Sequence, residues 1–133
     1  MTKIKTNMTP KHHVSQTIAK QLAEAGIVIE SEYGWVGFIN DNRGEYFEVK
    51  HERDSYPPRY PAPIATELLE RLPKYLTDED DMNWHLNISY DDYNTPYLSY
   101  QLNEMEWFNA VTADTAPNAL ALLLIRLTKD GLI

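Results

Sequence analysis

The segment that most constrains the fold is 119–127, a run of alanine, leucine and isoleucine broken by a single arginine. Asp114 or Thr115 would cap a helix here, with Pro117 in its first turn and Gly131 after its last residue. Four leucines form one stripe at helical spacing: Leu120, Leu123, Leu124 and Leu127. Because the remaining positions are apolar too, this helix must be packed on several sides, and we expect it to lie across a sheet as the centre of the core.

Two β-hairpins are predicted before that helix. Residues 35–39 and 46–50 are aromatic and β-branched, and Asn, Asp and Gly between them indicate a turn. Residues 84–90 alternate strictly between apolar and polar, and 98–102 continue as their partner strand. Residues 107–111 are either a fifth short strand or an irregular return.

Two further helices complete the expected order. One should run from Thr9-Pro10 to Gly26 and another over 64–72, with a stiff proline-rich connector at 51–63. The order α-ββ-α-ββ-α predicts an α+β fold with three helices and an antiparallel sheet of about four strands. We expect one domain over 1–133, because either side of the connector would be only about 50 to 70 residues long, marginal for a core of its own.

Charge is distributed unevenly along the 133 residues. The net charge is −8, yet residues 1–74 balance ten acids against ten bases. Residues 75–125 contain no lysine or arginine. They hold nine acids: Asp78, Glu79, Asp80, Asp81, Asp91, Asp92, Glu104, Glu106 and Asp114. A surface of one sign attracts oppositely charged partners, whereas direct nucleic-acid binding depends on lysine and arginine and is not expected.

Several classes of function are disfavoured by composition. The chain has no cysteine, which excludes disulfides, thiolate zinc sites and a cysteine nucleophile. We find no secretion signal and no apolar run near the roughly 20 residues of a membrane span. We therefore expect a cytoplasmic protein without membrane association, metal or cofactor.

The acidic and histidine clusters have ordinary interpretations. The loop 78–81 lacks the alternating ligands and the glycine of a calcium loop, so we interpret it as solvated. His12 and His13 would point about 100° apart on a helix and cannot share a metal. His85 belongs to a row of polar residues, with Asn83, Asn87 and Ser89, on the solvent-facing side of its strand. His51 lies beside carboxylates in the connector, where no nucleophile is implied.

Two segments, YPAPIATELLERLP at 60–73 and ADTAPNALALLL at 113–124, are distinctive when read together. The pair resembles small uncharacterised proteins of bacterial prophages and mobile elements, in which a Pro-Ala, helix, Leu-Pro segment precedes a strand pair and a terminal helix. The resemblance covers about the C-terminal 75 residues. It implies a bacterial or phage origin, and it brings no activity or catalytic residues with it.

Aromatic residues among the acids give the leading functional hypothesis. Tyrosine and tryptophan are enriched in binding hot spots, and arginines of a basic partner would find both carboxylates and ring faces. We expect a non-enzymatic interaction protein that binds a basic protein surface through residues 75–106. Its expected site is Asp78, Glu79, Asp80, Asp81, Asp91, Asp92, Tyr93, Tyr97, Glu104, Glu106 and Trp107.

Three alternatives remain open at this point. Trp107 and Phe108 would instead close the core beneath the last helix. A small enzyme or ligand-binding domain would use a pocket lined by Tyr46, His51, Glu52 and His85, between sheet and helices. A self-associating structural component would form a multimer, since the sequence leaves the oligomeric state open.

Overall fold

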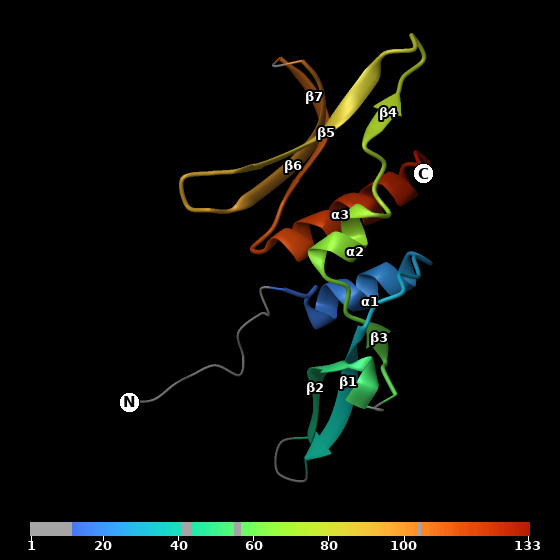
Figure 1. Cartoon of the computed structure of the whole chain (residues 1–133), viewed down its shortest axis with the longest axis vertical. Helices are drawn as coiled ribbons and strands as arrows, with labels where there is room; N and C mark the ends of the chain where they lie inside the picture. Colours follow the sequence, from blue (N-terminus) through green and yellow to red (C-terminus); the bar gives the residue numbers. More distant parts are fainter. Residues whose placement is uncertain (1–11, 41–43, 55–56, 104) are drawn as a thin grey trace.

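The computed structural model describes residues 12–40, 44–54, 57–103 and 105–133 (Figure 1). In chain order its elements are α1 (Gln16–Glu24), β1 (Tyr33–Asn40), β2 (Gly44–His51), a short 3₁₀ helix (Glu52–Asp54), β3 (Tyr60–Pro61), α2 (Ala65–Leu69), β4 (Tyr75–Thr77), β5 (Asn83–Tyr90), β6 (Pro96–Asn103), β7 (Glu106–Thr112) and α3 (Ala116–Lys129). The α+β class and the three α-helices are as predicted. None of the described helices is both long and apolar enough to cross a bilayer.

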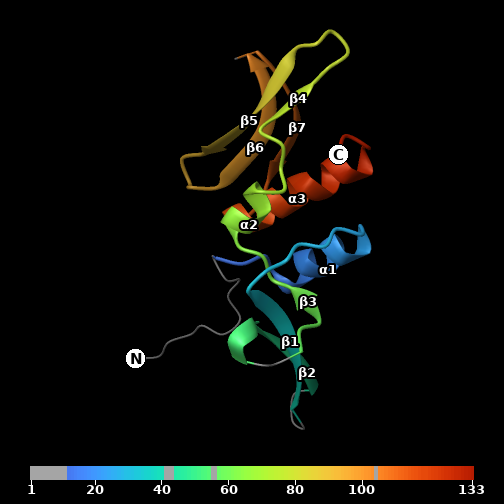
Figure 2. The same cartoon turned by 45° about the vertical axis from the view of Figure 1, so that its right-hand side comes forward.

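The described strands form two antiparallel sheets, in the orders β2-β1-β3 and β4-β5-β6-β7. Figures 1 and 2 show the three helices between them, with the β4–β7 sheet on one side and the first hairpin on the other. The prediction of about four strands from two hairpins is therefore wrong in count and order. Residues 107–111, left open above, belong to β7, and residues 75–77 add β4 to the second hairpin.

The proline-rich connector adds a short third strand to the first hairpin. Its residues Tyr60 and Pro61 pair with β1, and the Arg59 N–H donates to the Trp35 carbonyl at 2.7 Å. A Cβ atom at Gly34 would lie 2.5 Å from Cβ of Pro58, so only glycine permits this close approach. The connector thus covers the edge of β1 that faces away from β2 at Gly34 and Trp35.

Helix α1 begins at Gln16, and the expected start at Thr9-Pro10 lies outside the described residues. His12 and His13 are not helical, contrary to the prediction, because His13 pairs with Ile64 in an isolated antiparallel bridge. The Ser15 side chain then caps α1 by accepting a hydrogen bond from Ile18 N–H at 3.2 Å. Because of this contact with Ile64, which is 51 residues further along the chain, α1 begins only after His13.

The other two helices match the prediction to different degrees. Helix α2 covers 65–69, shorter than the expected 64–72. Helix α3 is capped by Thr115 and followed by Gly131, whose φ of 72° is the left-handed conformation that favours glycine. Both of these α3 boundaries agree with the sequence analysis.

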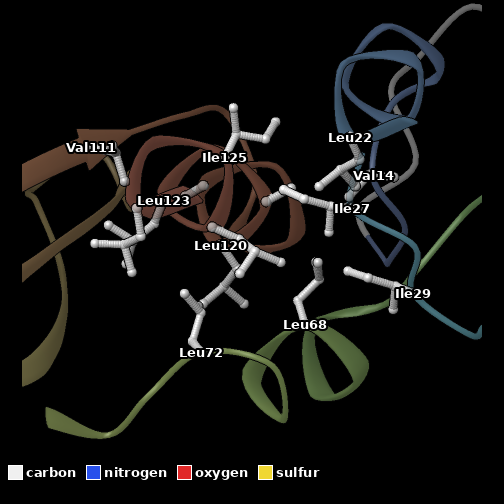
Figure 3. Packing of buried hydrophobic residues seen from close by; sticks show 14 of the residues in the cluster. Val14, Leu22, Ile27, Ile29, Leu68, Leu72, Val111, Leu120, Leu123 and Ile125 are labelled. Atoms are coloured by element: carbon white, nitrogen blue, oxygen red, sulfur yellow. The ribbon is translucent and has the colours of Figure 1, made fainter. Parts of the chain in front are cut away.

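Helix α3 lies at the centre of the core, as expected (Figure 3). Its leucines Leu123 and Leu127 are fully buried. They share one cluster with buried side chains of the β4–β7 sheet, of α2 and of the α1 region: Leu98, Tyr100, Val111, Leu68, Leu72, Val14, Leu22 and Ile27. The sheet therefore covers one side of α3, and α1 and α2 cover the other, whereas the face with Leu122, Arg126 and Lys129 is only partly covered.

A polar contact joins the first residues of α1 to those of α3. Asn118 is almost fully buried, and its Oδ1 accepts a hydrogen bond from Ser15 N–H at 2.8 Å. Its Nδ2 donates to Asp114 Oδ1 at 2.9 Å. Both ends of the amide are therefore satisfied, as a buried polar side chain requires.

Helix α2 offers a matched test of this core, because Leu68 is fully buried and Leu69 is 38% exposed. We expect Leu68→Ala to lower the free energy of unfolding by about 2 to 5 kcal/mol, and Leu69→Ala by less than about 1 kcal/mol. Urea denaturation of both variants measures the difference. An equal loss of unfolding free energy in both variants would show that Leu68 is not packed in the core as described.

Candidate interaction surface

One row of side chains crosses all four strands of the β4–β7 sheet. Tyr75 pairs with His85, His85 with Gln101, and Gln101 with Trp107. Because directly opposite residues of antiparallel strands point to the same side, the four side chains share one face. We call these four residues the cross-strand row.

The cross-strand row faces away from α3. The intervening register, Leu86 with Tyr100 and Tyr100 with Phe108, belongs to the core cluster beneath the sheet. By contrast, Tyr75 is 53% exposed and Trp107 is 52% exposed. Figure 2 shows the helices on one side of this sheet, and the core register faces them. We call the side that carries the cross-strand row the outer face.

The structure divides Trp107 and Phe108 between the two interpretations given above. Phe108 packs edge-to-face on Trp84 at 5.0 Å between ring centroids and stacks on Tyr100 at 5.9 Å. Trp107 points the other way, onto the outer face. Phe108 therefore closes the core, and Trp107 is an exposed aromatic residue as the interaction hypothesis requires.

A second row lies on the same face, four residues away along β5 and β6. Ser89 pairs with Tyr97, and Tyr97 pairs with Thr112. Tyr97 is 38% exposed. Between the rows, Gln101 Nε2 donates to the Oγ of Ser99 at 3.4 Å, and Ser99 is fully buried. The outer face is thus a polar surface with aromatic side chains on it, and not an apolar patch.

Two of the predicted interaction acids shape turns. Asp78 Oδ1 accepts hydrogen bonds from the N–H groups of Asp80 at 2.8 Å and Met82 at 3.0 Å, and its Oδ2 accepts one from Trp84 Nε1 at 2.8 Å. These bonds, that of the Trp84 indole first, lower the pKa of Asp78 below its ordinary value. Both carboxylate oxygens are therefore used within the chain.

The turn between β5 and β6 repeats this arrangement. Asp91 Oδ1 accepts from the N–H groups of Tyr93 at 2.8 Å and Thr95 at 2.9 Å. The third residue after each aspartate, Asp81 in one turn and Asn94 in the other, has φ near 60°. Aspartate and asparagine tolerate this left-handed conformation better than most residues, so turn chemistry accounts for part of the acidic clustering.

The acids frame the outer face from opposite ends of the strands. The turn at 78–81 and Glu106 lie at the end where Asn83 and Asn103 stand, whereas 91–92 follow the end where Tyr90 pairs with Pro96. The carboxylates do not form one continuous surface. Three exposed acids of the turns, Glu79, Asp80 and Asp92, have side chains that are not among the hydrogen-bond acceptors described for these turns.

The remaining predicted site residues have separate places. Tyr93 is 89% exposed at the tip of the β5–β6 turn. Glu106 Oε1 accepts from Asn103 Nδ2 at 3.2 Å. Asp114 belongs to the contact with Asn118, and Glu104 lies outside the described residues. Of the predicted set, Trp107 and Tyr97 are thus on the outer face itself, and most acids are at its ends.

The sequence analysis did not identify Tyr75 and Gln101 as site residues, and it interpreted His85 as an ordinary solvent-facing residue of its strand. The polar alternation around His85 was a correct signal for an exposed strand face. Which residues stand beside it depends on pairing across four strands, and a single strand's pattern does not encode that register.

Three hollows of the described surface bear on the alternative of a ligand pocket. One of about 870 Å³ lies between α1, β7 and α3, and there Arg126 Nη1 donates to the Ala110 carbonyl at 3.1 Å. A second, of about 460 Å³, includes His12, His13 and Tyr33, and a third of about 140 Å³ is apolar. None of the three is lined by the residues proposed for a pocket: Tyr46, His51, Glu52 and His85. Nor do the described residues contain a cluster of three metal-ligating side chains.

His13 is an unusual histidine. Both of its ring nitrogens are buried without a hydrogen-bond partner, and the ring contacts Tyr33 edge-to-face at 4.5 Å. Burial, then the charge of His12, lowers the pKa of His13, against a smaller opposing effect of Glu67. The folded state therefore favours neutral His13.

Comparisons with protein-family models, with curated proteins and with solved structures found no match to this chain.

The turn role of Asp78 is testable against its neighbour. We expect Asp78→Ala to lower the melting temperature clearly more than Asp80→Ala, because only the first change removes three acceptor bonds. Since the folded pKa of Asp78 is depressed, its contribution is present above the unfolded pKa and is lost as pH falls below about 4. Thermal denaturation followed by circular dichroism measures both effects, and equal losses for the two variants would contradict this role.

Acid sensitivity provides a test of His13. A folded pKa below the ordinary value means that stability is lost as pH falls through about 6.5. The variant His13→Phe keeps a ring against Tyr33 but cannot take up a proton. We expect its melting temperature to fall less than that of the wild type between about pH 7.5 and about pH 5.5. An identical fall in both proteins would refute a buried neutral His13.

Proposed function

We propose that the outer face of the β4–β7 sheet is a binding surface for a basic protein, and that the chain acts by occupying that surface without catalysis. The observation that carries the proposal is the cross-strand row, with an exposed aromatic residue at each end, Tyr75 and Trp107. Exposed aromatic side chains on a rigid sheet lose little freedom on binding and are typical anchors of protein interfaces.

Charge supports a basic partner. Residues 75–125 have no lysine or arginine, so the strands of the outer face and the turns between them bring neither of these residues to it. The acidic turns stand at both ends of this face and would steer a positively charged protein toward it. The aromatic residues on the outer face would therefore provide specificity for the partner, and the acidic turns at both ends of that face would attract it.

The proposal includes a setting. We place the protein in the cytoplasm, and the resemblance of segments 60–73 and 113–124 suggests a bacterial prophage or another mobile element as its source. A partner there would be a basic protein of the host or of the element itself.

Capture experiments with matched variants test the proposal. The face variant is Tyr75→Ala with Trp107→Ala, and the charge variant is Glu79→Gln, Asp80→Asn and Asp92→Asn. The control carries Glu24→Gln, Glu30→Gln and Glu70→Gln, three exposed acids outside the β4–β7 sheet with the same total change of charge. Circular dichroism confirms that each variant is folded.

We expect the tagged protein to capture a basic protein from bacterial lysate at low salt and to release it at high salt. The face variant should bind it at least about tenfold more weakly, the charge variant should bind it more slowly, and the control should match the wild type. Finding no partner with salt-dependent binding, or undiminished binding by the face variant, would overturn the proposal.

A further inference from the structure

The two exposed aromatic residues of the cross-strand row have a spacing set by the sheet. Tyr75 is on β4 and Trp107 is on β7, three strand spacings apart in the order β4-β5-β6-β7. At about 4.8 Å per spacing, their positions are separated by about 14 Å across the strands. This distance is a property of hydrogen-bonded strands and not of flexible loops.

An extended polypeptide matches that distance. Its side chains return to the same side every second residue at about 3.3 Å per residue, so residues i and i+4 share a side about 13 Å apart. A helix would need about nine residues to cover the same distance, and its side chains at that separation would not share a face. The row therefore favours an extended segment that crosses the strands.

Arginine suits the ends of this row better than lysine. A guanidinium is planar, stacks on aromatic rings and gives up its hydration more readily than an ammonium group. Tyr75 and Trp107 both offer exposed rings, and Tyr75 also contacts the His85 ring, with centroids 6.2 Å apart. No lysine or arginine of residues 75–125 competes for these rings.

We infer that the outer face binds an extended segment of its partner that carries two arginines four residues apart, one stacked on Tyr75 and the other on Trp107. The residue midway between the arginines lies over His85 and Gln101, whose polar side chains suit the backbone of the segment. This inference depends on the proposed function, because it names the part of the basic partner that this same surface recognises.

Synthetic peptides with equal charge test the inference. The first has two arginines separated by three small polar residues. The second moves one arginine to i+3, which places the two side chains on opposite sides of an extended chain. The third replaces both arginines of the first peptide with lysine. Fluorescence anisotropy at low salt gives the dissociation constants, and the indole N–H resonance of Trp107 reports where each peptide binds.

We expect the first peptide to bind at least about fivefold more tightly than either of the others and to shift the Trp107 resonance. Tyr75→Ala and Trp107→Ala should each remove this preference, and Trp107→Phe should restore most of it because a ring face remains. Tyr46→Ala, which changes a 40% exposed tyrosine on β2, should leave the preference unchanged.

The two proposals fail in different ways. Equal binding of the three peptides, or an unmoved Trp107 resonance, overturns the paired-arginine inference even when a basic protein is still captured through the outer face. If neither a peptide nor a basic protein binds through the outer face, the proposed function fails as well.

Discussion

Helix α3 needs apolar neighbours on nearly every side, and the rest of the molecule is arranged to supply them. The β4–β7 sheet covers one side of it, and α1 and α2 cover the other. Since these helices occupy the space between the sheets, the first hairpin cannot join the second and instead pairs with the connector. The same arrangement leaves the outer face of the β4–β7 sheet uncovered by any of the described helices. The burial of α3 therefore determines which face of this sheet stays exposed.

The acidic character of residues 75–125 has two physical origins. Asp78 and Asp91 are aspartates because two similar turns need a short acceptor side chain at their first position. Glu79, Asp80 and Asp92 are exposed beside them, and the geometry of those turns does not account for their charge. Charge composition alone could not separate these groups, since the hydrogen bonds that distinguish them form only in the folded turns.

Local patterns predicted the parts of the fold that local physics determines. The alternation around His85, the cap at Thr115 and the glycine at 131 each describe one element, and each is found as expected. Where an element depends on contacts between residues far apart in the sequence, its prediction was wrong or incomplete. His13 is extended because it meets Ile64, and Tyr75 is in a strand because it pairs with His85. The cross-strand row is a product of that long-range register, which is why the sequence left Trp107 open between surface and core and did not predict its alignment with Tyr75.

Arg126, the single charge within the most apolar segment, bonds to the carbonyl of Ala110 on the outermost strand. An unprotected outer strand is a template on which further strands, from this chain or another, can add. The Arg126 side chain thus occupies one carbonyl group of β7, while at the other side of the sheet the three residues of β4 pair with Asn83, Trp84 and His85 of β5. A charged side chain at this position makes the addition of a further strand beside Ala110 less favourable, because that strand would have to displace the guanidinium group.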